Sequence, residues 1–129
     1  MFTRVSWKVL GVALGFLVAA ASVTAWSPID RLTYLTFSRS VALPGVTLAA
    51  GTYAFEIANP LGDGSIVCVR DKGRQHAYYM GMTLPIDRPA GLKSDQQVLF
   101  GEPSSNQPPP IVAWFPPDDS RGRQFIYRK

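Results

Sequence analysis

The chain has 129 residues, of which 47% are hydrophobic, and its formal net charge is +4. This length is enough for one domain, and the hydrophobic fraction is ordinary for a globular protein. The charge is too small to predict binding to nucleic acid, which requires a dense basic patch, and a single cysteine excludes an internal disulfide.

The segment 1–25 has the layout of a secretory signal peptide. Arg4 and Lys8 give it a basic start, and an uncharged apolar run follows over Val9–Ala21. Val23-Thr24-Ala25 then supplies the small residues at which a signal peptidase cleaves. The pattern predicts a signal-peptide helix and export to the periplasm or the medium.

We expect cleavage after Ala25 and a mature domain over 26–129. Losing the two basic residues of the signal lowers the formal charge to +2. Cleavage in the region 19–21 is a second choice, and an uncleaved anchor is the rival interpretation. After removal of the signal we expect no membrane span.

The segment that begins at Gly51 is predicted to be a strand over a hydrophobic core. Tyr53, Phe55 and Ile57 lie two residues apart and therefore share one face, whereas Glu56 lies on the other. One apolar and one more polar face are typical of a strand that covers a core on one side.

Tyr53 has the setting of a tyrosine corner, a feature of Greek-key β-proteins. In that feature the hydroxyl of a tyrosine near the start of a strand bonds to a backbone group a few residues upstream. The pattern Leu48-x-x-Gly51-x-Tyr53 fits it, although Ala50 stands where proline is usual. The alternative is an ordinary core aromatic at the exit of a turn, and both interpretations are structural.

Upstream of Gly51 the chain is predicted to turn at Pro44-Gly45. We expect residues 33–57 to form a strand, a turn, a short extended piece, a second turn and another strand.

Residues 37–55 read Phe37-x-x-x-Val41-x-Leu43-Pro44-Gly45-x-x-Leu48-x-Ala50-Gly51-Thr52-Tyr53-x-Phe55. This pattern resembles a unit that recurs in small secreted bacterial proteins of unknown function. The resemblance extends to Trp114-Phe115-Pro116 and Gly122-x-x-Phe125-x-Tyr127. It implies an exported β-domain and carries over no activity, because none is established for that group.

A β-hairpin is predicted over Ser65–Leu84. Its loop is Asp71-Lys72-Gly73, with Gly73 expected in the left-handed position. The residues of the return strand divide into two faces, Tyr78, Met80, Met82 and Leu84 on one, and Ala77, Tyr79, Gly81 and Thr83 on the other.

The rest of the chain alternates loops with short strands. We expect a surface loop over 85–95, a proline-rich loop over 103–110 and a hairpin connection over 116–123, with strands at 96–102, 111–115 and 124–127. About seven strands with no helical periodicity after the signal predict one all-β domain, an antiparallel Greek-key β-sandwich, with a small β-barrel as the alternative.

The residues that could bind metal are sparse. His76 is the only histidine and Cys68 the only cysteine, whereas zinc takes three or four such ligands at close spacing. Asn59, Asp63, Asp118 and Asp119 could offer oxygen ligands to calcium, but turn chemistry accounts for them. We therefore expect no metal and no cofactor.

Cys68 lies in the predicted apolar strand Ile66-Val67-Cys68-Val69. We interpret it as a small buried hydrophobe. A reactive thiol would need a nearby base or helix N-terminus, and none is evident. An intermolecular disulfide remains an alternative if the side chain is exposed.

A hydrolase is an alternative function that would use His76 or a pair of carboxylates. Glu56 and Glu102 are the only glutamates, and most aspartates fall in predicted turns. The serines lie in or beside turns without a nucleophile elbow, and no glycine-rich phosphate loop is present. We expect that the chain is not an enzyme.

Adjacent aromatic residues are the remaining functional lead. In each of the pairs Tyr78-Tyr79 and Trp114-Phe115 the two rings are expected on opposite faces of a strand. Exposed rings of Tyr79, Trp114 and Phe115 would form a platform for a glycan or an envelope protein. The alternative is burial of these rings on both faces.

These patterns favour an exported, non-catalytic interaction or structural module of the bacterial cell envelope. A glycan-binding module is the first alternative. Gly51, Tyr53, Pro44 and Gly45 are expected to have structural roles only.

Overall fold

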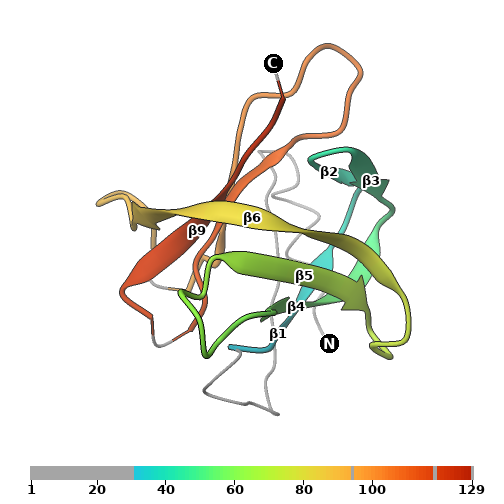
Figure 1. Cartoon of the computed structure of the whole chain (residues 1–129). Helices are drawn as coiled ribbons and strands as arrows, with labels where there is room; N and C mark the ends of the chain where they lie inside the picture. The colour runs from blue at the N-terminus through green and yellow to red at the C-terminus, as the bar shows by residue number, and fades with distance from the viewer. Residues whose placement is uncertain (1–30, 94, 118, 129) are drawn as a thin grey trace.

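The structure is a computed structural model of the chain, and it describes residues 31–93, 95–117 and 119–128. These residues form strands and no helix (Figure 1). None of the described segments is a helix with the length and hydrophobicity to cross a bilayer. The predicted signal peptide over 1–25 lies outside the described residues. The strands are β1 (Thr33–Phe37), β2 (Val41–Leu43), β3 (Val46–Leu48), β4 (Gly51–Ile57), β5 (Ile66–Asp71), β6 (Ala77–Asp87), β7 (Val98–Phe100), β8 (Ile111–Trp114) and β9 (Arg121–Phe125).

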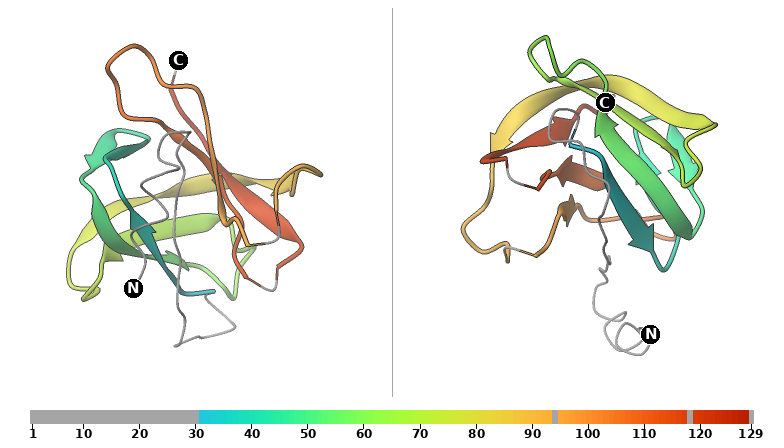
Figure 2. Two further views of the ribbon diagram at one scale, coloured as in Figure 1. Left: turned by 180° about the vertical axis from the view of Figure 1, so that it is seen from behind. Right: turned by 90° about the horizontal axis from the view of Figure 1, so that it is seen from below.

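Seven of the strands form one antiparallel sheet in the order β1-β4-β5-β6-β9-β8-β7. The long strand β6 connects its two halves, because Met82 and the residues before it pair with β5, whereas Thr83 and the residues after it pair with β9. The sheet curls at this strand into a half-barrel, so that the N-terminal strands face the C-terminal strands (Figure 2). The rings of Phe55 in β4 and Trp114 in β8 meet between the two halves, with centroids 5.6 Å apart.

The predicted all-β, antiparallel fold is confirmed. Strands β7, β8 and β9 follow one another in the sheet, and β6 lies beside β9 after a long connection, which is a Greek key. The two layers expected of a sandwich are two halves of one continuous sheet, because β6 runs from one layer into the other. The curvature also gives the fold the character of a partly open barrel.

The Pro44-Gly45 turn is confirmed. Leu43 pairs with Val46, so these two residues form the whole loop of the β2–β3 hairpin. Gly45 has a φ of 77°, which is the conformation that a type II turn requires after proline. The hairpin is a separate two-stranded sheet, and the N–H of Ala42 connects it to the segment before β8 by donating to the carbonyl of Pro109 at 2.9 Å. The single hydroxyl hydrogen of Tyr127 is shared between the carbonyls of Ala42, at 3.1 Å, and Ile111, at 2.7 Å.

Tyr53 forms a tyrosine corner, which is one of the two interpretations that its sequence setting left open. Its hydroxyl donates a 2.7 Å hydrogen bond to the carbonyl of Ala49, four residues upstream. Gly51, between them, has a φ of 154°, a conformation that favours glycine. The side chain of Tyr53 is buried, and its hydroxyl lies 3.8 Å from the position of a Cβ on Gly51.

The predicted pairing of the Ser65–Leu84 hairpin is confirmed, but its loop differs. The left-handed residue is Arg74, with a φ of 61°, and not Gly73. The carboxylate of Asp71 accepts hydrogen bonds from the backbone N–H groups of Gln75 and His76. These bonds hold the loop between Asp71 and Ala77, which is longer than the predicted loop of three residues. The left-handed residue therefore lies one position later than predicted.

The predicted loop from residue 85 begins too early, because β6 continues to Asp87 with Pro85 opposite Arg123. The N–H of Thr83 points toward β5 and donates to the carbonyl of Ser65. The nitrogen of Pro85, two residues on, faces the same side, where the β5 pairing has already ended. A proline is therefore tolerated in this strand without the loss of a ladder hydrogen bond.

Candidate functional site

The predicted aromatic platform does not form. Trp114 is 0% exposed and Phe115 is 2% exposed, so neither ring is available to stack on a ligand. Trp114 faces the interior of the half-barrel against Phe55. Because β8 lies between β7 and β9, it is the central strand that its continuous apolar sequence predicts.

Phe115 is buried on the opposite face of the strand from Trp114, because Gly122 and Arg88 enclose its ring. A Cβ on Gly122 of β9 would collide with the Phe115 ring, so glycine at this position leaves the space that the ring fills. The guanidinium carbon of Arg88 lies 5.1 Å from the ring centroid and covers it from the connection after β6. The adjacent rings of Trp114 and Phe115 are thus both enclosed.

Tyr79 faces the interior and is half-buried. Its ring packs edge-on against Phe125, with centroids 5.6 Å apart. The same ring lies over Gly81, where a Cβ would come within 2.9 Å of the Tyr79 Cζ. Burial raises the pKa of the Tyr79 hydroxyl. The ring of Tyr79 therefore packs against the core and is not paired with an exposed Trp114 or Phe115 ring.

Tyr78 is the extra residue of a β-bulge in β6. The pairing steps from Val69 opposite Tyr79 to Arg70 opposite Ala77 and leaves Tyr78 without a partner residue. The ring of Tyr78 packs on Tyr53, with centroids 5.5 Å apart, and on the exposed ring of His76. The expected alternation of the Tyr78-Tyr79 pair is therefore interrupted by the bulge.

The outward face of β6 is apolar, although the solvent face of a strand that covers a core is usually polar. Met80, Met82 and Leu84 are 56%, 59% and 52% exposed. Phe125 pairs with Thr83, so the exposed Ile126 follows it at the level of Met82. We call Met80, Met82, Leu84 and Ile126 the β6 stripe. Large apolar side chains are thus exposed where an alternating strand usually places polar ones.

The inward face of β6 explains this inversion. Its residues are Tyr79, the small Gly81 and Thr83, whose hydroxyl donates a 2.6 Å hydrogen bond to the carbonyl of Ser65. The interior opposite them is already filled by rings such as Trp114 and Phe125. The inward positions of β6 therefore take small or polar side chains, and the methionines and Leu84 face outward.

Charged residues lie on the same outward face, on the neighbouring strands. Glu56 of β4 is buried, with 8% of its side chain exposed, and it contacts two arginines. The Nε of Arg70 donates to one carboxylate oxygen at 3.1 Å, and Arg74 donates to the other. One buried carboxylate is thus shared by two partly exposed guanidinium groups, and the cluster has a net positive charge.

Cys68 lies between this cluster and the stripe, opposite Glu56 on one side and Met80 on the other. It is a free cysteine with 0% exposure, so the interpretation as a small buried hydrophobe is confirmed. Burial raises the pKa of its thiol, and the charge of Arg70 opposes this effect in part. A raised pKa disfavours the thiolate that redox or nucleophilic chemistry requires.

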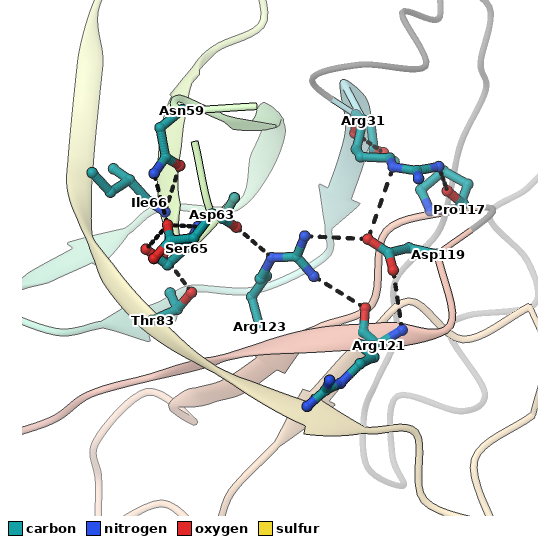
Figure 3. Close-up of polar contacts among 12 residues, drawn as sticks. Arg31, Asn59, Asp63, Ser65, Ile66, Thr83, Pro117, Asp119, Arg121 and Arg123 are labelled. Atoms are coloured by element: carbon teal, nitrogen blue, oxygen red, sulfur yellow. Dashed lines mark hydrogen bonds and ion pairs between the residues drawn. The ribbon is translucent and has the colours of Figure 1, made fainter. Parts of the chain in front are cut away.

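A second polar cluster lies at one end of the half-barrel (Figure 3). The side chain of Arg123 donates through Nε to the carbonyl of Gly64 at 2.7 Å and through Nη2 to Asp119 at 3.2 Å. Asp119 also lies 3.8 Å from the Nε of Arg31, which donates through Nη1 to the carbonyl of Pro117. These contacts join the start of β1, the β4–β5 loop and the β8–β9 turn, and we interpret the cluster as a structural clasp.

The oxygen atoms considered for calcium are engaged by protein donors. Asp63 accepts hydrogen bonds from Asn59 and from the backbone and hydroxyl of Ser65, and these bonds lower the pKa of its carboxyl. Asp119 is bound to the arginines of the clasp, and Asp118 lies outside the described residues. Within 31–93, 95–117 and 119–128, no group of three or more His, Cys, Asp or Glu residues is placed to hold a metal ion.

The sequence indicated two faces for the return strand of the hairpin but did not assign the β6 stripe to solvent. The alternation of Met80, Met82 and Leu84 was a visible signal. A comparison of the chain with protein-family models found no match. Searches of curated proteins and of solved structures also found none.

Proposed function

We propose that this chain is an exported, non-catalytic interaction module of the cell envelope, and that the β6 stripe is its binding surface. The observation that carries the proposal is the exposure of Met80, Met82, Leu84 and Ile126 side by side on one sheet face. Scattered exposed apolar residues are normal, whereas a contiguous apolar patch is typical of an interaction site.

The position of the stripe supports this proposal. β6 is hydrogen-bonded to β5 along one half and to β9 along the other. Its side chains are therefore held on a rigid support, and outward residues such as Met82 cannot turn inward without breaking both pairings. Methionine is flexible and polarizable, which suits a surface that must adapt to the side chains of a partner.

The contacts of the candidate catalytic groups also support a non-catalytic role. His76 is exposed, and its ring packs on Tyr78 with centroids 5.0 Å apart. Glu56 is bound by two arginines, an arrangement that stabilises a structural carboxylate. The glycan alternative used exposed rings of Tyr79 and of Trp114 or Phe115, and the burial of Trp114 and Phe115 favours the interaction module over it.

Site-specific photocrosslinking in the producing cell tests the binding surface. A photoreactive amino acid is placed at Met82, and a matched control carries it at Leu61, which is 92% exposed but lies in the β4–β5 loop, outside the stripe. We expect a discrete protein adduct from position 82 and none from position 61. Absence of an adduct at position 82, or the same adducts from both positions, would contradict the proposal.

Export is tested on the same cells. We expect the mature protein outside the cytoplasm, with Trp26 as its first residue by mass spectrometry, because the predicted cleavage follows Ala25. A cytoplasmic protein that retains residues 1–25 would contradict this part of the proposal.

A further inference from the structure

The charges around the β6 stripe indicate the chemistry of its partner. Arg70 and Arg74 lie beside the Met80 end of the stripe, on the hairpin that joins β5 to β6. Arg128 lies two residues after Ile126 and is exposed. Arg88 lies four residues beyond Leu84, and its guanidinium donates to the carbonyls of Lys93 and Gln96. Four arginines thus lie near the borders of the stripe, against the two carboxylates of Glu56 and Asp87, and the balance of charge there is positive.

Among the described residues, two carboxylates lie near these arginines, and both are paired with arginine. Asp87, at the end of β6 next to Arg88, lies 3.7 Å from the Nε of Arg121. Glu56 is buried, whereas 32% of the Arg70 side chain and 42% of the Arg74 side chain are exposed. Arg70 contacts Glu56 through Nε and Arg74 through Nη2. A guanidinium carries five N–H donors, so both arginines retain donors that an incoming carboxylate can accept.

We propose that the β6 stripe binds an acidic amphipathic segment of another protein. This inference rests on the function proposed above and specifies the class of partner. The apolar side chains of the segment contact Met80, Met82, Leu84 and Ile126, and its carboxylates pair with Arg70 and Arg74. The apolar contacts provide affinity, and the basic border selects acidic partners and orients them.

A second copy of this chain fits the surface less well. Face-to-face packing of two copies through the stripe would place one arginine border close to another. Juxtaposed like charges at an interface oppose association. The charge pattern therefore favours a partner of opposite sign.

A lipid surface also fits less well. Proteins that bind to a bilayer surface typically insert aromatic and leucine side chains to the depth of the headgroups. Here the large rings Trp114 and Phe115 are buried, and the stripe follows mainly the single strand β6. A surface of this width matches one row of side chains on a single extended or helical segment.

The inference is tested with two synthetic peptides and the purified mature protein. One peptide alternates leucine with glutamate, and the other has lysine in place of every glutamate. Binding is measured by fluorescence anisotropy at low and high salt. We expect the glutamate peptide to bind at least about tenfold more tightly than the lysine peptide, with an affinity that falls as salt screens the arginines.

Three variants locate the binding. Met82→Ser is expected to weaken binding of the glutamate peptide at least about tenfold, because it removes an apolar contact at the centre of the stripe. Arg74→Gln is expected to weaken the same binding about two- to fivefold, the range of a partly exposed ion pair. Arg39→Gln, at an exposed position between β1 and β2, is the matched control and should leave it unchanged. Circular dichroism verifies that each variant is folded.

Four outcomes would overturn the inference. Equal binding of both peptides that is lost in Met82→Ser would reject an acidic partner and leave the stripe as an interaction surface. Sedimentation with anionic vesicles, lost in Met82→Ser and without peptide binding, would identify a lipid surface instead. A dimer in analytical ultracentrifugation that dissociates in Met82→Ser would identify a second copy. No binding of any probe, together with no adduct at position 82, would overturn both this inference and the proposed function.

Discussion

The ring of Phe37 in β1 lies against the ring of Phe100 in β7, with centroids 6.3 Å apart, although these strands are the two opposite edges of the large sheet. The sheet therefore curls far enough for its first and last strands to share one core. The half-barrel is closed on this side by side chains and not by a ladder of hydrogen bonds. Phe37 also packs on Tyr53 and Phe55 of β4, so the closing contact is continuous with the core.

Gly122→Ala is expected to destabilise the protein by about 1–3 kcal/mol, the usual cost of overpacking a core. The added methyl group would collide with the buried ring of Phe115 and lie 3.1 Å from the carbonyl of Trp114. Urea unfolding measures the difference. Gly91→Ala is the matched control, because its methyl group would meet no atom within 4 Å. Equal stability of the two variants would contradict the account of Phe115 burial.

Tyr53→Phe is expected to lower the free energy of unfolding by about 1 kcal/mol, the typical net contribution of one hydrogen bond. The change removes the 2.7 Å bond to the carbonyl of Ala49 and leaves the buried ring in place. Tyr34→Phe in β1 provides the comparison, because the hydroxyl of Tyr34 forms no such corner. A tyrosine corner predicts a larger loss at position 53 than at position 34 in chemical unfolding.

Glu56→Gln is expected to destabilise the fold by about 1–3 kcal/mol, the range for a hydrogen bond to a charged group. The amide keeps the shape of the side chain but removes the charge that holds Arg70 and Arg74 together. The exposed Glu102→Gln is the control and should be close to neutral. If both variants unfold at the same urea concentration as the parent, the cluster does not stabilise the sheet.

Alkaline pH is expected to unfold the protein through three tyrosines that are buried or partly buried. Burial raises the pKa of Tyr127, Tyr79 and Tyr53 above the ordinary value of 10.0. A raised pKa means that the folded state favours the neutral phenol, so this contribution is complete below pH 10 and is lost as the pH rises further.

Absorbance of the phenolate between pH 9 and 13 checks this prediction. We expect the buried tyrosines to ionise only together with unfolding, as followed by circular dichroism. Tyr127→Phe should move the unfolding transition to higher pH, after allowance for the loss of its bonds to Ala42 and Ile111 at neutral pH. Ionisation of every tyrosine in an intact fold would contradict the burial.

Local patterns in the sequence were enough to predict much of the fold. Pro44-Gly45 and the setting of Tyr53 each depend on neighbours within a few residues, and both predictions hold. The pairing of the hairpin over 65–84 also follows from adjacent segments. Each of these features depends on residues that are close together in the sequence, so a local pattern is enough to predict it.

The candidate surface could be predicted only in part. The alternation along β6 separates Met82 from Thr83, but the face that points to solvent depends on what other strands place in the interior. The burial of Phe115 depends on Gly122 and Arg88, which the fold alone brings against the ring. Periodicity within one strand carries no information on either point, because both are decided by residues on other strands.

The division of β6 between its two neighbours has a consequence for the order of folding. Strands β1, β4, β5 and the first half of β6 pair with one another within residues 33–82, with the β2–β3 hairpin inserted between β1 and β4. The unit β7-β8-β9 can join only at the second half of β6, over a longer loop. Because contacts between distant segments form slowly, we expect the N-terminal strands to pair first during synthesis and to serve as the template on which the C-terminal strands are added.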